Sequence, residues 1–521
     1  MGKYYMGLDV STQGTKLLLL DYETKRPAFV TSVNYDRDLP AYNTRNGVIQ
    51  GLGAGVSESD PAMWVEAVHR VLQQTRDAGF DLARVAAVSV SGQQHGLVCL
   101  DAAGNLTRKT SKLWNDVSTQ PECEEITRLA GGKPAVIREV GNSLKPGYTA
   151  SKILQFKKSD PQAFAATTTF FLVHNFVNWF LTGGKQGGVR DMEPGDTSGM
   201  ALWNPATKSW SRAVCNAIAS DLIAKLTEVR PAMECIGRIS AELCQKYGFS
   251  PECRVDAGSG DNMYGAAGTG NVRPGTVTIS LGTSGTAFTV LTEPYVDPEG
   301  EIASFCDSLG NYLPLLCVSN LANGYNALQR KFGFDHKAFE EILLKTRPGN
   351  NGRIVLPWFE GERTPDLPQA APIFFGFTPD DFTCEALCRG IVEGHVMNLY
   401  EGFLRLPVKA QSIRLTGGLS RSKGWRQTIA DIFGCEVVPV AGEGAALGAA
   451  IHAAYVDNRQ NVRALAAFVD SFVELNEAER ARPDPANAAT YETLRKAYLA
   501  LSRRVRGAGD ANDPFALRAR L

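Results

Sequence analysis

Two short turns that combine glycine with hydroxyl side chains carry the clearest chemistry in this 521-residue sequence. Thr12-Gln13-Gly14-Thr15 recurs as Thr283-Ser284-Gly285-Thr286, offset by 271 residues. In a tight glycine-containing turn, backbone N–H groups converge on an anion, and Ser or Thr hydroxyls add hydrogen-bond donors. Two such turns together predict a site that holds a polyphosphate from both sides.

Two charged residues flank the first turn. Lys16 places a positive charge directly after it, and Asp9 ends the apolar run before it. Mg²⁺ prefers oxygen ligands and keeps several waters, so Asp9 is its expected partner, directly or through water. The alternatives are an Asp that caps its own turn and hairpin turns that bind no ligand.

The apolar residues around the two turns are also in register. At the same offset, four apolar positions match, pairing Leu8 with Ile279, Val10 with Leu281, Leu17 with Phe288 and Leu19 with Val290. Apolar alternation on both sides of a short turn is typical of a β-hairpin. The sequence therefore predicts two duplicated halves that each open with a hairpin, with chance similarity as the alternative.

The elements that position these turns alternate between strand and helix patterns, which favours an α/β fold with largely parallel strands. The Ala-rich segment 444–455 is expected to be a tightly packed core helix. Further strands are expected at 85–90, 254–257, 412–415 and 436–440, and further helices at 64–78, 150–158, 162–166, 172–181, 425–433 and from Asp261 onward.

Composition and motif content exclude several classes of protein. The 54 basic and 55 acidic residues give a net charge of −1, without the basic surplus of a nucleic-acid-binding protein. No stretch has the apolar length of a membrane span. P-loop, dinucleotide-binding, protein-kinase and G-x-S-x-G motifs are absent. We expect a cytoplasmic protein without nucleic acid or membrane as a partner.

Several segments, in order along the chain, resemble the motifs of the FGGY family of carbohydrate kinases, which share a duplicated actin/hexokinase/Hsp70-like (ribonuclease H-like) α/β fold around a catalytic cleft. The resemblance runs from about residue 4 to 455 and implies an N-terminal domain of residues 1–255 and a C-terminal domain of residues 256–521 with a helical tail. The segments are the phosphate-type motifs 7–16 and 280–285, the catalytic-loop motif 258–262, the stretch 361–365 and the adenosine-type motif 416–420.

The resemblance implies transfer of the γ-phosphate of ATP to a sugar hydroxyl with Mg²⁺, a reaction catalysed mainly by positioning and charge stabilisation. Asp261 is the implied general base, and Asp9 is the implied metal ligand. The Gly/Ser turn before Asp261 lets a ligand approach closely. The alternative is that Asp261 only caps its helix, where N–H groups would keep the carboxylate ionised.

The implied sugar site combines a polar loop with the catalytic motif. Gln94 and His95 follow the 85–90 strand at its carboxyl end, where open α/β sheets place ligands. Asn262 offers a donor and an acceptor to a sugar hydroxyl, and Trp114 could cover an apolar sugar face or pack in the core. Asp116, two residues after Trp114, is expected to be structural, with a supporting role near the sugar or the metal as the alternative.

The resemblance assigns ATP to both halves of the chain. Gly417 and Gly418 would let the backbone lie flat against the adenine or ribose, with Leu419 packed on the base and Ser422 within reach of it. The implied ATP-binding residues are Thr12, Gly14, Thr15, Lys16, Gly282, Thr283, Ser284, Gly417, Gly418, Leu419 and Ser422.

The loop 91–96 is most similar to that of family members that phosphorylate D-xylulose, so D-xylulose is the expected sugar and D-xylulose 5-phosphate the expected product. A homodimer is common in the family. One alternative is a related kinase for ribulose, glycerol or gluconate. Another is an actin-like ATPase that acts on protein partners, against which the polar loop 93–96 argues.

Overall fold

A computed structural model describes residues 2–442, 444–507 and 520 of the chain. Contacts between residues group the chain into two compact units. The first holds the chain up to Val272 together with Val290–Leu313 and Gly442–Val473, and the second holds Arg273–Thr289, Pro314–Ala441 and the chain from Glu474 onward. The expected domain boundary after residue 255 stays a prediction, but by these contacts residues 256–272 and 442–473 belong with the first unit.

The first predicted hairpin lies at the centre of the first unit's sheet, and the prediction of its strands is confirmed. β1 (Tyr4–Val10) pairs antiparallel with β2 (Gly14–Asp21) and parallel with β7 (Val85–Gly92). The strand order is β13-β14-β7-β1-β2-β3, with β15 also paired to β7. Asp9, near the carboxyl end of β1, is the register partner of Lys16 on β2 and of Ser91 on β7.

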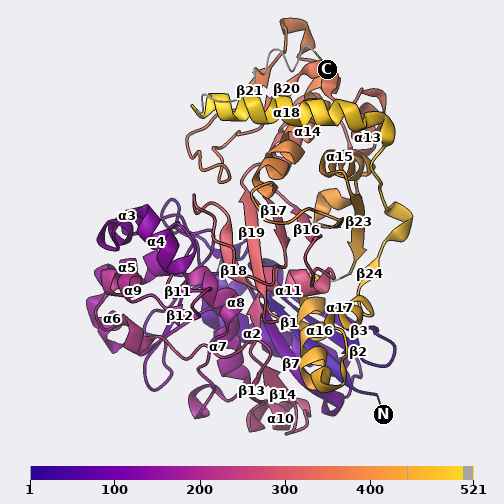
Figure 1. Cartoon of the computed structure of the whole chain (residues 1–521). Coiled ribbons are helices and arrows are strands. Elements are labelled where there is room, and N and C mark those ends of the chain that lie inside the picture. Colours follow the sequence, from indigo (N-terminus) through magenta and orange to yellow (C-terminus); the bar gives the residue numbers. More distant parts are fainter. Residues whose placement is uncertain (1, 443, 508–519, 521) are drawn as a thin grey trace. The chain divides into compact units, whose positions relative to one another are not determined.

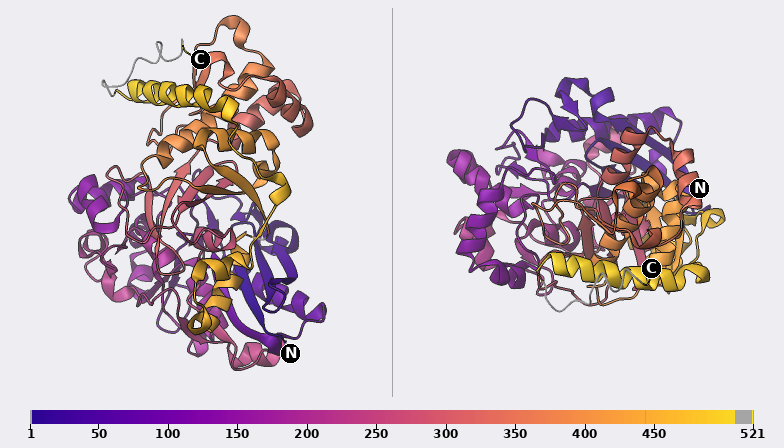
Figure 2. Two further views of the ribbon diagram at one scale, coloured as in Figure 1. Left: turned by 45° about the vertical axis from the view of Figure 1, so that its right-hand side comes forward. Right: turned by 90° about the horizontal axis from the view of Figure 1, so that it is seen from above.

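Side chains of β1 alternate between two cores because successive residues of a strand point to opposite faces. Met6 and Leu8 belong to one core, which contains α2 (Pro61–Asp77) and α7 (Val173–Leu181). Tyr5 belongs to the other, together with α16 (Gly444–Asn458). Figures 1 and 2 show α16 alongside the N-terminal strands. The sheet is therefore covered by helices on both faces, as the α/β prediction requires.

The approach of α16 to the sheet depends on glycine. A Cβ at Gly7 of β1 would lie 1.9 Å from the Ala446 carbonyl oxygen, and a Cβ at Gly448 would lie 1.8 Å from the Tyr264 carbonyl oxygen. A Cβ at Gly268 would lie 2.1 Å from the Gly444 carbonyl oxygen. At all three positions backbone meets backbone directly, so no side chain fits between the elements.

The second unit repeats the local arrangement of the first. β16 (Thr276–Leu281) pairs antiparallel with β17 (Gly285–Thr289) and parallel with β22 (Ser412–Thr416). The strands of this unit run in the order β19-β17-β16-β22-β23-β24. A hairpin whose first strand has a parallel neighbour on its other side thus occurs in both units, which confirms the second hairpin and agrees with a duplication.

The remaining principal elements connect these sheets and cover them. In the first unit they are β3 (Arg26–Asn34), α3 (Gln120–Leu129), α4 (Lys133–Val140), α5 (Thr149–Ser159), α6 (Pro161–Ala166), α8 (Pro194–Thr197), α9 (Arg212–Ile218), β13 (Cys235–Arg238), α10 (Ala241–Tyr247), β14 (Arg254–Asp256), β15 (Ser259–Gly260), α11 (Asp261–Gly268), β18 (Ala303–Cys306) and α17 (Leu465–Asp470). β19 (Tyr312–Val318) leads into the second unit, whose other elements are α12 (Ala322–Phe332), α13 (His336–Lys345), β20 (Ile354–Leu356), β21 (Ile373–Phe375), α14 (Cys384–Phe403), α15 (Lys423–Phe433), β23 (Glu436–Ala441), β24 (Glu474–Leu475) and α18 (Ala488–Val505).

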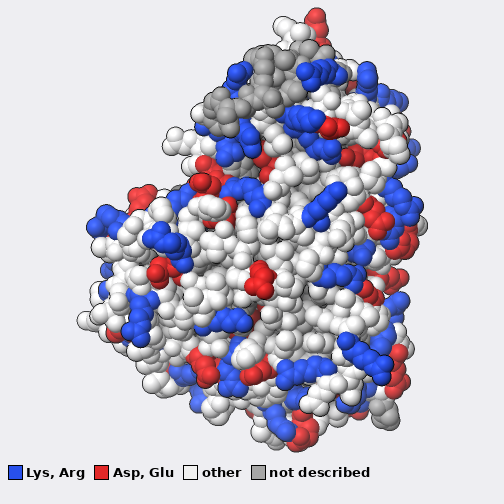
Figure 3. All heavy atoms as spheres, viewed as in Figure 1, with Lys and Arg blue, Asp and Glu red and all other residues white. Residues whose placement is uncertain are grey.

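The described helices and the visible surface agree with the composition. Within the described part of the chain, no helix combines the length and apolarity that crossing a membrane requires. On the face shown in Figure 3, basic and acidic side chains are interspersed among the residues drawn in colour. This mixture reflects the balance of 54 basic and 55 acidic residues.

Candidate active site

Asp9 lies where the first hairpin meets the loop that follows β7. Ser91 donates a hydrogen bond from Oγ to Asp9 Oδ1 at 2.8 Å. Burial raises the pKa of Asp9, while the Ser91 hydrogen bond and the charge of Lys16 oppose that rise. Asp9 is therefore a carboxylate at the carboxyl end of the central strand, with a positive charge on the neighbouring strand.

Asp261 is the first residue of α11, and Gly260 is the helix N-cap. The alternative that Asp261 caps this helix is not met, because Gly260 occupies the N-cap position and no side-chain cap hydrogen bond is present there. Burial raises the pKa of Asp261 to about 8, and the negative charges of Asp9 and Asp196 add to the rise. In the chain without metal or ligand, burial and two neighbouring carboxylates thus outweigh the helix N–H group of Asn262, which acts in the opposite direction and lowers the pKa.

Asn262 joins the catalytic motif to the polar loop. Its Nδ2 donates to Gln94 Oε1 at 2.8 Å and to Asp261 Oδ1 at 3.0 Å. Gln94 is 5% exposed, and its Nε2 has no hydrogen-bond partner among the described residues. An unpaired buried amide is costly, so this donor suits a ligand oxygen. Gln94, Asn262 and Asp261 are thus brought together, as the sequence predicts.

His95 is held by aromatic and backbone contacts in the same loop. Its φ of 63° lies in the left-handed region that non-glycine residues rarely adopt. The ring centroid lies 4.9 Å from that of Tyr148 and 5.8 Å from that of Phe305. Gly199 leaves room for the ring, because a Cβ there would lie 2.5 Å from His95 Cε1.

Trp114 and Asp116 have different surroundings. Trp114 is 40% exposed and donates from Nε1 to Thr12 Oγ1 at 2.9 Å, so it is not a core residue. Asp116 is buried and accepts hydrogen bonds from Ser118, Lys112 and Ser57. Although burial opposes the effect, these bonds lower the pKa of Asp116. Asp116 anchors its loop, which agrees with the structural interpretation.

The residues of the first turn face in different directions. Thr12 hydrogen-bonds through Oγ1 to Gln93 Oε1 at 3.2 Å, which ties the turn to the polar loop. Thr15 is buried, and its hydroxyl lies 2.9 Å from the Tyr35 hydroxyl, toward the interior. Thr15 therefore turns its hydroxyl away from the turn, and its backbone is paired with Val33 of β3.

In the second unit, the second turn and the adenosine-type turn lie against one another. Gly417 has a φ of 88°, and a Cβ there would lie 2.5 Å from the Leu281 carbonyl oxygen at the end of β16. Thr283, Ser284, Gly417 and Gly418 are exposed, and Gly282 and Leu419 are partly buried. Ser422 caps α15 by accepting a hydrogen bond from the Trp425 N–H at 3.2 Å, and it also bonds to Glu340. Its hydroxyl is therefore already engaged within this unit.

The sequence analysis did not include a buried cluster of Glu193, Asp196 and His174, which contacts the polar loop through the His95 N–H. Glu193 accepts hydrogen bonds from the Gly195 and Asp196 N–H groups, both at 2.7 Å, and burial raises its pKa to about 7. His174 Nδ1 lies 3.3 Å from Asp196 Oδ2. Segment 195–199 reads Gly-Asp-Thr-Ser-Gly, a glycine-flanked polar stretch like the other motifs, and this sequence signal could have placed Asp196 near the site.

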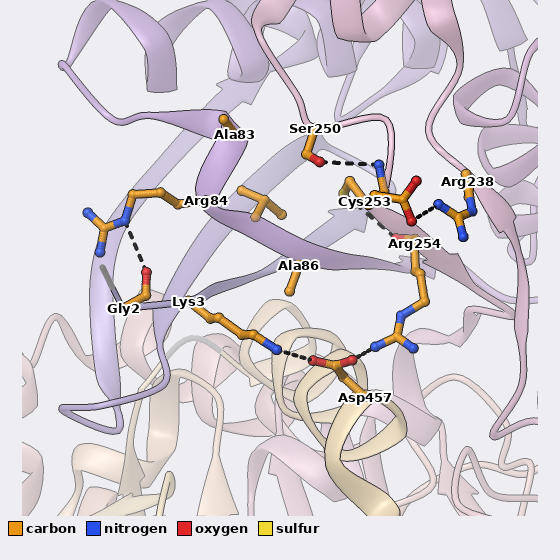
Figure 4. Close-up of a pocket in the computed structure, with 12 residues that line it drawn as sticks. Gly2, Lys3, Ala83, Arg84, Ala86, Arg238, Ser250, Cys253, Arg254 and Asp457 are labelled. Carbon is orange, nitrogen blue, oxygen red and sulfur yellow. Dashed lines mark hydrogen bonds and ion pairs between the residues drawn. The ribbon is translucent and has the colours of Figure 1, made fainter.

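A separate hollow lies at the other end of the same strands (Figure 4). Its volume is about 490 Å³, and it is lined at the amino ends of β1, β7 and β14. Lys3 donates to Asp457 Oδ2 at 3.4 Å, and Arg254 pairs with the same carboxylate. Asp9 and the polar loop lie at the carboxyl ends, where sheets of this kind bind ligands, so this hollow is not the candidate active site.

Asp9 can hold a magnesium ion only together with oxygen atoms supplied by a bound phosphate and by water. Among the described residues, no group of three or more His, Cys, Asp or Glu side chains could hold a metal ion. Mg²⁺ is commonly bound by one or two carboxylates together with phosphate oxygens and water. A single carboxylate such as Asp9 is compatible with that mode.

The duplicated hairpins, the carboxylates of Asp9 and Asp261 and the polar loop are those of a phosphotransferase with a duplicated α/β fold. Family models for the N-terminal and C-terminal domains of the FGGY family of carbohydrate kinases match residues 4–268 and 277–456. The chain belongs to the FGGY family of carbohydrate kinases, and a kinase of this family uses ATP.

Individual relatives and solved structures resemble nearly the whole chain. A protein of Haemophilus influenzae named xylulose kinase is 35% identical, over 95% of this chain and 98% of its own. The crystal structure of xylulose kinase from Bifidobacterium adolescentis has a TM-score of 0.78 at 26% identity, covering 95% of this chain and 99% of its own. The crystal structure of gluconate kinase from Lactobacillus acidophilus has a TM-score of 0.84 at 23% identity, over 98% and 99% of the two chains.

Proposed function

We propose that this protein transfers the γ-phosphoryl group of ATP to a hydroxyl of D-xylulose and forms D-xylulose 5-phosphate. The observation that carries the phosphotransfer is the position of Asn262, which hydrogen-bonds to both Gln94 and Asp261. One amide thereby aligns a polar loop suited to sugar hydroxyls with the carboxylate that would take the proton.

The choice of sugar is supported by sequence rather than by fold. A gluconate kinase and a xylulose kinase both share the fold with this chain. The relative from H. influenzae, at 35% identity along almost the whole chain, is named a xylulose kinase. The loop containing Gln94 and His95 also resembles that of D-xylulose-phosphorylating members. These two similarities together support D-xylulose over ribulose, glycerol or gluconate.

In the proposed reaction, the chain's own residues bind, orient and deprotonate the sugar. Gln94, His95 and Asn262 hydrogen-bond to its hydroxyls, and Trp114 covers an apolar face. The Asp261 carboxylate accepts the proton of the attacking hydroxyl, whose oxygen displaces ADP from the γ-phosphorus. Because little covalent chemistry is left to the protein, positioning and charge supply most of the rate.

The family resemblance assigns nucleotide-binding residues in each of the two units. The phosphate-binding residues are Thr12, Gly14, Thr15 and Lys16 in the first turn and Gly282, Thr283 and Ser284 in the second, with the Lys16 ammonium supplying a positive charge. Gly417, Gly418 and Leu419 contact the adenosine, and Ser422 contributes mainly by shaping the start of α15. Mg²⁺, held by Asp9 directly or through water, would neutralise charge on the phosphates.

A coupled assay of ADP release tests the proposal. D-xylulose, D-ribulose, glycerol and D-gluconate are each offered with ATP and Mg²⁺. We expect kcat/KM to be highest for D-xylulose, with little ADP release when sugar is omitted. ADP release that does not depend on any sugar would instead indicate an ATPase that acts on other partners.

Substituting Asp261→Asn tests the base. We expect kcat to fall about 10²–10⁴-fold, because the amide cannot accept the proton, while ATP affinity by calorimetry stays nearly unchanged. Asp221→Asn, at an exposed aspartate, is the matched control and should keep full activity. Normal turnover by Asp261→Asn would remove this residue from the base role.

The cellular setting of the enzyme is also a proposal. We propose that it acts in the cytoplasm as a homodimer, as is common in the family. Analytical ultracentrifugation of the purified full chain distinguishes a dimer from a monomer, and fractionation of the source cells tests the location.

A further inference from the structure

His95 adopts a backbone conformation that needs support from its surroundings. Its φ of 63° is left-handed, and the residue is not a glycine. Such a conformation is disfavoured for an L-residue with a Cβ and persists only where surrounding contacts hold it. In this chain the supporting side chains can be named.

Three buried side chains contact the backbone of His95. The carbonyl oxygen accepts hydrogen bonds from Lys152 Nζ at 2.7 Å and from Thr149 Oγ1 at 3.2 Å. The N–H donates to Asp196 Oδ1 at 3.4 Å. Thr149, Lys152 and Asp196 all have a relative exposure of 0%. Both peptide groups of His95 are therefore tied to the interior.

The first turn of α5 supplies most of this support. Thr149 begins the helix, and Lys152 lies three residues later, so both side chains project from the same face. Tyr148, the N-cap of α5, contacts the His95 ring edge-on. One helical turn thus holds the carbonyl and the ring of a single residue.

Burial of the Lys152 side chain at this position is energetically unfavourable. Lysine is almost never fully buried unless it is paired, because removing the ammonium from water is unfavourable. Burial lowers the pKa of Lys152 to about 7, against the opposing effect of the Asp116 and Asp196 carboxylates and with a smaller lowering from Lys112. Among the described residues, the His95 carbonyl oxygen is its hydrogen-bond acceptor.

We infer that Lys152 and Thr149 are positioning residues that hold the His95 carbonyl, and thereby keep the His95 ring in the orientation that binds the sugar. This inference rests on the proposed role of His95 in sugar binding. Neither residue needs to touch the sugar, and neither lies in the proposed ATP site. Loss of either donor should weaken sugar binding without affecting ATP binding.

Steady-state kinetics of three single variants and one control variant test the inference. Lys152→Met and Thr149→Val keep the size of each side chain but remove the donor. We expect each to raise the KM for the sugar about 10-fold or more, since a hydrogen bond from a buried group is lost, and to leave the KM for ATP within twofold. Thr149→Ser keeps the hydroxyl and should restore the wild-type KM.

The matched control is Lys157→Met on the same helix. Lys157 Nζ also donates to a backbone carbonyl, that of Ile218 at 2.6 Å, but this carbonyl lies outside the polar loop. The Lys157→Met variant should therefore have the same KM for the sugar as the wild type. An increase of both KM values together, or the same sugar KM in Lys152→Met as in Lys157→Met, would overturn the inference.

The wild-type assay separates this inference from the proposed function. If D-xylulose is not phosphorylated, the proposed function fails, and the variants are compared with the best sugar of the panel. A crystal structure of the Thr149→Val/Lys152→Met double variant gives a readout that needs no turnover. We expect His95 to leave the left-handed region and its ring to move, whereas an unchanged φ and ring position refute the inference.

Discussion

In the protein without metal or ligand, the surroundings of the Asp261 carboxylate favour its protonated form. Burial and the charges of Asp9 and Asp196 raise its pKa to about 8, far above the ordinary value of an aspartate. An acid with a raised folded-state pKa stabilises the fold only while it is protonated. That stability is fully present below the unfolded pKa and is lost as the pH rises through the folded pKa.

The metal-free, ligand-free protein should therefore show a pH-dependent effect of Asp261→Asn. At pH 9 the variant should have a higher Tm than the wild type, on the order of 2–4 °C, because the buried charge is removed. At pH 4–5 the two proteins should have nearly equal Tm values. Scanning calorimetry across this pH range provides the measurement.

Asp221→Asn is the control for this comparison and should show no such trend. A Tm difference that is the same at pH 5 and pH 9 would show that Asp261 is not titrating in this range. A lower Tm for Asp261→Asn at pH 9 would show that the ionised carboxylate stabilises the fold instead.

The sequence predicted which residues form the candidate site better than it predicted their surroundings. The family resemblance of their motifs placed Gln94, Asn262 and Asp261 together, and in the structure β15, which leads to Asp261, pairs with β7, which leads to Gln94. The left-handed backbone of His95 and the buried Lys152 beneath it could not be predicted. They depend on contacts between residues 57 positions apart, for which local patterns carry no signal.

Among the elements, α16 has little room for change. Gly448 brings the helix so close to α11 that a Cβ would lie 1.8 Å from the Tyr264 carbonyl oxygen. The sequence predicted this helix and its burial from an Ala-rich run. A helix that is apolar on all sides does not reveal its partners, so its packing against β1 and α11 could not be predicted.

Gly448→Ala should destabilise the protein, because α11 and α16 must separate to admit the methyl group. Overpacking of this kind costs about 1–3 kcal/mol. Because α11 begins with Asp261, we also expect a lower kcat. Thermal unfolding and the coupled assay give the two readouts.

Gly53→Ala is the matched control. Gly53 is exposed, and the nearest atom to an added Cβ is a Val56 methyl carbon at 3.8 Å. It should leave Tm and kcat unchanged. An unaltered Tm in Gly448→Ala would mean that the two helices separate at little cost.

For the molecule as a whole, the first unit is assembled from three separate stretches of chain. Tyr5, Leu18, Leu20 and Ala87 pack against Ala450, Ile451 and Ala454 of α16. The chain must therefore pass through much of the second unit before it completes the first. The two duplicated hairpins were visible in the sequence, whereas this return of the chain was not.

A fragment that ends at Val272 should fail to fold cooperatively. It contains the strands of the first sheet but lacks α16, so one face of that sheet stays uncovered. We expect strong binding of an apolar dye and no sharp thermal transition, in contrast to the full chain. Adding a peptide of residues 442–473 should reduce dye binding.

A fragment that shows a sharp thermal transition and does not bind the dye would contradict this prediction. It would show that the first 272 residues form a self-sufficient domain. In that case α16 would be an accessory helix rather than part of the core.

The late return of α16 also has a consequence for biosynthesis. Translation adds about 5–20 residues per second, so the roughly 170 residues between Val272 and α16 take on the order of 10–30 s. During that interval the nascent chain carries an apolar sheet face whose cover has not yet left the ribosome. Demand for chaperones should therefore peak while the second half of the chain is being made, and a pause in that region would prolong the exposure.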